Sequence, residues 1–276
     1  MKQEKGGLMD WSRTKTIFIL TFLVLNLFLG FQLIEKKNEN QFDFIPVSSI
    51  EEQLKQSKIT YKKLSQAPEK LAPISGQVQK FDEEKIKQLE GKNLNIQLIE
   101  NQTLLTGSFK EPGTMPSTEA QLLNFLQTYT FNSTDYIRWT DHHQENESVI
   151  LTQTYEGRPI FYNLESKRGQ IHLFKNDEGE LTGYTQSYLN ITKQGNEHPI
   201  LEPIKALYRL YENNDIVYED NITRMELGYY SAVEGEIQVF VPTWYIEVNN
   251  ERSYLVNAVY GLIDKRAAGD KGEKTS

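Results

Sequence analysis

The histidines of this chain carry side chains that can support acid–base catalysis or bind a metal ion. One local cluster combines them with a carboxylate, Asp141-His142-His143. Its surroundings predict a strand, in which neighbouring side chains point to opposite faces, so two adjacent imidazoles cannot bind one ion without a bulge. His172 and His198 are isolated in the sequence. We therefore interpret all these histidines as surface or half-buried side chains, with a metal or catalytic site as the alternative.

Paired carboxylates occur at Glu51-Glu52 and around Glu234-Gly235-Glu236. One pair falls on a predicted helix and the other in a predicted hairpin turn, where solvated charges are the ordinary explanation. The sequence contains no glycine-rich phosphate loop and no serine nucleophile elbow. The absence of cysteine excludes thiol catalysis, disulfides and cysteine-ligated zinc. The sequence therefore predicts a protein that is not an enzyme and has no cofactor or metal.

Residues 17–34 read IFILTFLVLNLFLGFQLI and contain no charged side chain. As a helix this segment spans about 27 Å, just enough to cross the hydrocarbon core of a bilayer. The end of the segment lacks the small residues of a signal-peptidase site, and the segment lacks the polar face of a buried amphipathic helix. We therefore predict an uncleaved, single-pass transmembrane helix at residues 17–34.

Charge on either side of this segment predicts its orientation. The net charge of the chain is −8, yet the residues before 35 hold four basic side chains against two acidic ones. The basic tail, residues 1–16, is expected to stay in the cytoplasm while the acidic body is exported, so the protein should reside in the cell membrane. An acidic body also argues against nucleic acid as a partner, because phosphate binding needs clustered Lys and Arg.

A polar stripe interrupts the predicted transmembrane helix. Asn26 lies at its centre, where an unpaired amide is costly, and Gly30 follows four residues later on the same helix face. Together with Phe22 and Leu33, they are the predicted contact residues for a helix of another membrane protein. The alternative is a plain anchor that tolerates one Asn and one Gly.

The N-terminal run MDWSRTKTIFI, which starts at Met9, is followed by LNLFL at residues 25–29 and resembles the N-terminus of the YycI (WalI) family. The similarity is looser at residues 155–161, 183–189 and 241–246, so it extends from Met9 to about Asp264. Family members begin at the equivalent of Met9, which we expect to be the true start. The family motif is carried by Asp10, Trp11, Ser12, Lys15 and Thr16.

Proteins of this family are membrane-anchored accessory regulators of the WalK (YycG) sensor kinase, part of the WalK/WalR two-component system that controls cell-wall metabolism in low-GC Gram-positive bacteria. The resemblance implies a non-enzymatic regulator whose partners are WalK and a YycH-type accessory protein. The alternative is a membrane-tethered extracytoplasmic module that binds a cell-wall polymer or a peptide.

The exported part is expected to be α+β, with antiparallel sheets and helices packed on one side, similar to YycH and YycI and weakly similar to PepSY-type domains. A linker at residues 35–46 should precede a first lobe at 47–112 and a second lobe at 113–264. The boundary is placed at the EPGTMP segment, residues 111–116, because Pro and Gly interrupt the pattern there. Residues 265–276 should form a disordered tail.

Apolar spacing predicts the elements of the exported part. Helices are expected at residues 47–56, 82–89, 117–129 and 199–211, with Ser117 as the cap of the third. Strands are expected at residues 94–99, 104–109, 136–142, 149–155, 160–164, 170–174, 181–188, 222–230, 236–241, 243–248 and 254–259. For Tyr229, Tyr230 and Tyr245 we favour a place in the core, with an exposed aromatic surface for a partner as the alternative.

Overall fold

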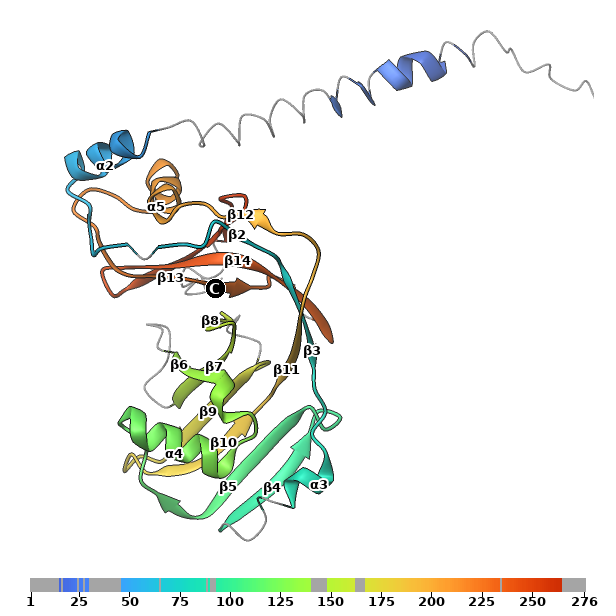
Figure 1. Cartoon of the computed structure of the whole chain (residues 1–276), viewed down its shortest axis with the longest axis vertical. Helices are drawn as coiled ribbons and strands as arrows, with labels where there is room; N and C mark the ends of the chain where they lie inside the picture. The colour runs from blue at the N-terminus through green and yellow to red at the C-terminus, as the bar shows by residue number, and fades with distance from the viewer. Residues whose placement is uncertain are drawn as a thin grey trace, which may run out of the picture. The chain divides into compact units, whose positions relative to one another are not determined.

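The computed structural model describes residues 15, 17–23, 25, 26, 28, 29, 46–64, 66–87, 89, 93–139, 148–161, 167–233 and 235–264. The chain divides into two compact units, Met1–Ser49 and Ile50–Ser276. In the first unit, the described residues between 15 and 29 are helical (Figure 1). No helix among the described residues is long and apolar enough to cross a membrane. Part of the predicted transmembrane segment, including residues 30–34, lies outside the described residues, as do residues 35–45 of the predicted linker at 35–46 and the predicted tail at 265–276.

The second unit is α+β, and its sheets are mostly antiparallel, as predicted. Over the described residues, its strands form two seven-stranded sheets and one short pair, β2 (Lys70–Leu71) with β12 (His198–Pro199). The first sheet contains β1 (Thr60–Tyr61), β13 (Asn221–Tyr230), β14 (Ile237–Val248), β15 (Arg252–Asn257) and β16 (Ile263–Asp264), with β3 (Ile74–Val78) and β11 (Leu189–Lys193) joined through β14. The second sheet contains β4 (Leu94–Ile99), β5 (Leu104–Gly113), β10 (Leu181–Gln186), β9 (Gln170–Lys175), β7 (Ser148–Tyr155) and β6 (Tyr136–Trp139), with β8 (Arg158–Pro159) on β7.

The two sheets do not follow the two chain segments expected from the sequence. The predicted boundary between residues 112 and 113 falls inside β5, which runs to Gly113. Strands β1 and β3 come before this boundary and belong to the first sheet, whereas β4 and nearly all of β5 come before it and belong to the second sheet. Each sheet therefore combines strands from both sides of the boundary.

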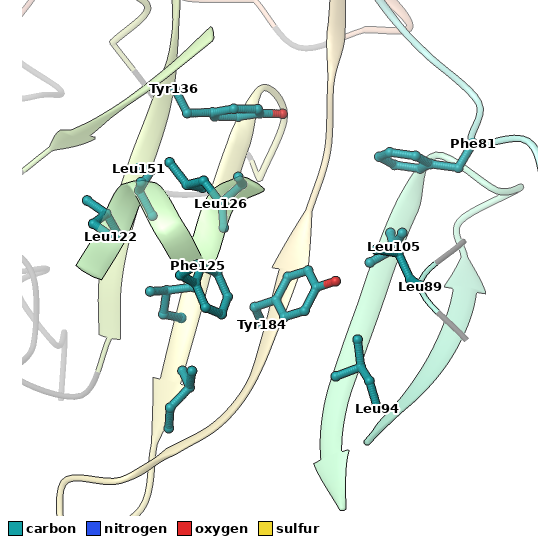
Figure 2. Close-up of a cluster of buried hydrophobic side chains, with 13 residues drawn as sticks. Phe81, Leu89, Leu94, Leu105, Leu122, Phe125, Leu126, Tyr136, Leu151 and Tyr184 are labelled. Atoms are coloured by element: carbon teal, nitrogen blue, oxygen red, sulfur yellow. The ribbon is translucent and has the colours of Figure 1, made fainter. Parts of the chain in front are cut away.

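Helix α4 (Glu119–Tyr129) covers one face of the second sheet (Figure 1). Its buried residues Leu122, Phe125 and Leu126 pack in the cluster that Figure 2 shows, together with Tyr184 of β10 and Leu151 of β7. The predicted range started at its cap, Ser117, whereas the cap is Thr118, one residue later, and the helix begins at Glu119. The Thr118 side chain accepts a hydrogen bond from the Gln121 N–H, and the Gln121 side chain accepts one from the Thr118 N–H, which forms a capping box.

The first sheet is covered by α5 (Pro203–Glu212), which begins four residues later than predicted. Pro203 occupies the first turn, where its missing N–H costs nothing. Its apolar face buries Ile204, Leu207 and Leu210, whereas Tyr211, which was expected on the same face, is half-buried. The indole Nε1 of Trp244 on β14 donates to the Leu201 carbonyl oxygen over 2.9 Å, which ties the sheet to the segment before α5.

Helix α2 (Val47–Gln56) has the predicted bounds and buries Ile50 and Leu54, as expected. Helix α3 (Glu83–Ile86) is shorter than predicted, although Asp82 caps it by accepting from the Glu84 N–H over 2.9 Å. Short strands β1, β2, β3, β8, β11, β12 and β16 were not expected from the sequence. Of the strand predicted at residues 160–164, only Ile160, in an isolated bridge to Tyr229, and Phe161 are described. Strand β11 continues the predicted strand at residues 181–188 after a break, and it leaves the second sheet to pair with β3.

Strands predicted at residues 236–241 and 243–248 form one strand, β14, which passes through Pro242. The Pro242 carbonyl oxygen accepts from the N–H of Ala258, the residue just after β15 ends. The N–H that proline lacks would face the Ala258 carbonyl oxygen, which instead accepts from the Leu201 N–H over 2.7 Å. Proline therefore leaves this acceptor satisfied, and the strand continues.

Candidate partner-binding surfaces

The helical part of the first unit presents an apolar surface. Its side chains are widely exposed, for example Phe18 at 75% and Phe22 at 66%. The Asn26 Nδ2 donates to the Phe22 carbonyl oxygen over 2.8 Å, so one N–H of this amide is used within the helix. Its second N–H and its carbonyl oxygen can hydrogen bond to a neighbouring helix. Of the other site residues predicted from the sequence, Lys15 is helical, and Asp10, Trp11, Ser12, Thr16, Gly30 and Leu33 lie outside the described residues.

A second apolar surface lies on the first sheet, in a groove of about 620 Å³ between the β13–β14 loop and β16. Its apolar lining consists mainly of Val233, Val239, Val241, Leu255, Leu262 and Ile263. Two of the lining residues are strongly exposed, Val233 at 73% and Leu262 at 58%. Ile237, two residues before Val239 on β14, is 63% exposed. Apolar residues gathered at this exposure are typical of protein interaction sites. We call this surface the apolar groove.

The apolar groove continues a sheet face that is buried further along. Val239, Val241 and Thr243 alternate along β14 on the face that also carries Tyr245. The Tyr245 ring packs edge-on against Trp139 of the second sheet, with ring centroids 4.9 Å apart. The face is therefore covered at the Tyr245 end and open at the Val239 end.

Trp139 is the centre of the junction between the two sheets. It is 2% exposed, and it packs with Phe161, Tyr230, Tyr245 and Leu255 in one buried cluster. The guanidinium group of Arg224 on β13 lies 4.0 Å from the Trp139 ring centroid and forms an ion pair with Glu226 at 2.6 Å. Beside this cluster, the Phe161 N–H donates to the Tyr229 carbonyl oxygen over 2.8 Å, so the chain after β8 pairs with β13.

The tyrosines lie in the core, as favoured from the sequence, and the alternative of an exposed aromatic surface is wrong. Tyr229, Tyr230 and Tyr245 are 1%, 6% and 3% exposed. Tyr229 packs against Ile74 and Phe240 on one face of the first sheet, and Tyr230 joins the Trp139 cluster on the other. Because both faces are covered here, strand alternation leaves neither side chain in solvent.

The histidines and carboxylates singled out in the sequence do not assemble a site in the described part of the chain. Asp141, His142 and His143 lie outside the described residues, and the described ones contain no group of His, Asp or Glu that could hold a metal ion. Burial, with a smaller contribution from Lys167, lowers the pKa of the half-buried His172 to about 4. His198 lies in β12, and Glu51, Glu52 and Glu236 are exposed.

Comparison with known proteins identifies the protein family. Residues 38–259, well over half of the chain, match the family model described as YycI protein. No curated protein matches the chain. A crystal structure of an uncharacterized protein from Eubacterium rectale ATCC 33656 shares 9% identity with a TM-score of 0.46, over 75% of this chain and 90% of that one. A likeness at this level supports no argument about fold or function.

Proposed function

Because the chain belongs to the YycI family, we propose that it modulates the WalK sensor kinase together with a YycH-type accessory protein, and so controls cell-wall metabolism. YycI proteins are regulatory accessory proteins of the WalK system. In this proposal residues 17–34 anchor the chain in the membrane as a single helix, the N-terminus lies in the cytoplasm, and the second unit is extracytoplasmic.

The family match over residues 38–259 is the observation that carries the proposal. Physically, a regulator changes the output of a kinase only if it binds one signalling state better than the other. Contact between helices in the membrane would give such a preference, and the exposed apolar side chains around Asn26 supply the required surface. The stripe is Phe22 and Asn26, continued in the sequence by Gly30 and Leu33.

Replacement of Asn26 by Leu tests the membrane contact. The variant should lower the amount of WalK that co-purifies with the full-length protein from membranes by about threefold, because a hydrogen bond between membrane helices contributes about 0.6 kcal/mol on average. Thr21→Val is the matched control, since the Thr21 hydroxyl donates to the Ile17 carbonyl oxygen of its own helix over 2.8 Å. Equal WalK recovery with both variants would contradict a role for the stripe.

The apolar groove is the proposed docking surface for the YycH-type partner. Its exposed aliphatic side chains, gathered beside the short edge strand β16, match the apolar centre of a protein interface. A charge placed there should oppose association, because it must be buried without a partner in the complex.

Val239→Lys tests the docking surface. Val239 is 46% exposed, and Val217, which lies outside the groove, is 48% exposed, so Val217→Lys is a matched control. We expect Val239→Lys to reduce capture of full-length YycH from membranes at least tenfold, since a buried unpaired charge costs about 3–5 kcal/mol. The control should bind as the native chain does. Loss of capture with neither variant would place the YycH contact elsewhere.

A further inference from the structure

A second hollow lies in the second sheet, on the α4 side, and has a volume of about 370 Å³. We propose that it binds a neutral saccharide of one or two rings, a function beyond the regulation of WalK. The volume falls within the range of small-ligand sites, which begins at about 300 Å³. We call it the bulge pocket, and its argued contacts are Asn93, Phe109, Glu111, Gln121, Asn124 and Tyr129.

An irregularity of strand pairing creates the bulge pocket. Leu181 of β10 pairs with Gly113 of β5, and Gly183 pairs with Ser108. One residue of β10 therefore lies opposite four residues of β5, and these four residues have no paired residue on β10. Such bulges redirect side chains and are frequent beside binding sites. Here the extra residues begin with Phe109 and include Glu111, and both line the pocket.

Aromatic rings form the apolar wall of the bulge pocket. Phe109 and Tyr129 meet edge to face at 89°, with centroids 5.1 Å apart, and Phe125 packs against Tyr129 at 5.3 Å. The Tyr129 main-chain oxygen accepts a hydrogen bond from the Tyr184 hydroxyl, and Figure 2 shows Tyr184 beside Phe125. These contacts fix the rings before any ligand arrives, and a fixed aromatic face suits the C–H face of a sugar ring.

The polar groups of the bulge pocket suit hydroxyl and amide groups of a ligand. The Gln121 Oε1 accepts from Ser117 N–H and Oγ–H, both at 3.0 Å, and from the Thr118 N–H at 3.2 Å. The side chain is therefore held in place while both N–H groups of its Nε2 are left to donate. Among the described residues, no hydrogen bond is formed by the side-chain amide of Asn124 or by the hydroxyl group of Tyr129.

Charge and backbone pairing separate a saccharide from other ligands. The described lining holds one carboxylate and no Lys or Arg, which favours a neutral ligand over a phosphate or a carboxylate. Strand β5 pairs with β4 up to Phe109 and with β10 up to Ser108 and again at Gly113, so only residues 110–112 lack a strand partner, too short an edge for an extended peptide. The single carboxylate, Glu111, can accept hydrogen bonds from sugar hydroxyls.

The test uses the full-length protein in micelles of a detergent that has no sugar headgroup. Di-N-acetylchitobiose, a neutral two-ring saccharide, is titrated and followed by saturation-transfer difference NMR. We expect saturable binding with Kd of about 1 mM, the order for a small neutral ligand on an open site. Tyr129→Phe and Asn124→Ala should each raise Kd by about two- to tenfold, the effect of one neutral hydrogen bond.

Asn190→Ala is the matched control, because Asn190 is an exposed asparagine on β11 outside the pocket. It should leave Kd unchanged, and circular dichroism should show all three variants folded. No saturable binding at millimolar concentrations would overturn the proposal, and so would binding that the two pocket variants leave unchanged. Binding of D-alanyl-D-alanine with the same sensitivity to the variants would overturn the assignment of the ligand as a saccharide.

Discussion

Replacement of Trp139 by Ala should weaken the junction between the two sheets. The side chain is 2% exposed, and truncation of such a buried tryptophan costs about 3–5 kcal/mol through lost burial and the cavity left behind. The Arg224 guanidinium at 4.0 Å adds a cation–π contribution of about 0.5–2 kcal/mol, which the same change removes. We therefore expect the free energy of unfolding to fall by about 3.5–7 kcal/mol, a large part of the 5–15 kcal/mol of an ordinary domain.

Urea unfolding of the full-length protein in micelles measures this loss, with circular dichroism following the sheets. Tyr260→Ala is the control, because Tyr260 is 56% exposed and its removal should cost less than about 0.5 kcal/mol. Arg224→Ala, alone and combined with Trp139→Ala, isolates the coupling between the two side chains. A loss below about 1 kcal/mol for Trp139→Ala would refute the view that this residue holds the sheets together.

Two further predictions concern the sheets. The pKa of His172 is about 4 when folded and 6.5 ordinarily, so between these values the unfolded chain binds a proton that the folded chain does not. The free energy of unfolding should therefore fall as the pH drops from 6.5 to 4, by up to about 1.4 kcal/mol per pH unit, and His172→Gln should flatten this part of the measured pH profile. Gly228→Ala should destabilise by about 1–3 kcal/mol in urea unfolding, because the added Cβ would overlap the Pro159 carbonyl oxygen and lie 2.6 Å from the Phe161 ring. Gly113→Ala, where a Cβ meets nothing within 4 Å, should leave stability unchanged; equal losses for the two glycine variants would contradict the overlap.

Elements with a strong local pattern could be predicted from the sequence. Helix α2 has the predicted bounds because Ile50 and Leu54 recur at helical spacing, and β4 alternates between its two faces. The start of α4 was also readable, since Thr118 and Gln121 have the spacing of a capping box, whereas Ser117 is followed three residues later by Ala120.

Elements that depend on distant partners could not be predicted. Strand β3 reads ISGQV and becomes a strand because β11 and β14 pair with it from far along the chain. Its Gly76 allows Phe240 to approach, since a Cβ there would lie 2.9 Å from that ring. The apolar groove and the bulge pocket likewise arise from where strands end or shift register, and neither event has a signal in local residue spacing.

The mixed origin of the two sheets also affects how the chain can fold. Thr60 of β1 pairs with Asn221 of β13. The β4–β5 hairpin keeps one unpaired edge on β5 until β10 has been synthesised and pairs with it. Such distant pairings require long loops to close, and the entropy of loop closure is lost before the strand contacts form. Folding should therefore be slow compared with that of helical proteins of similar stability. A nascent chain that has not yet reached β10 has two unfinished sheets with open strand edges, which are sites for aggregation and proteolysis.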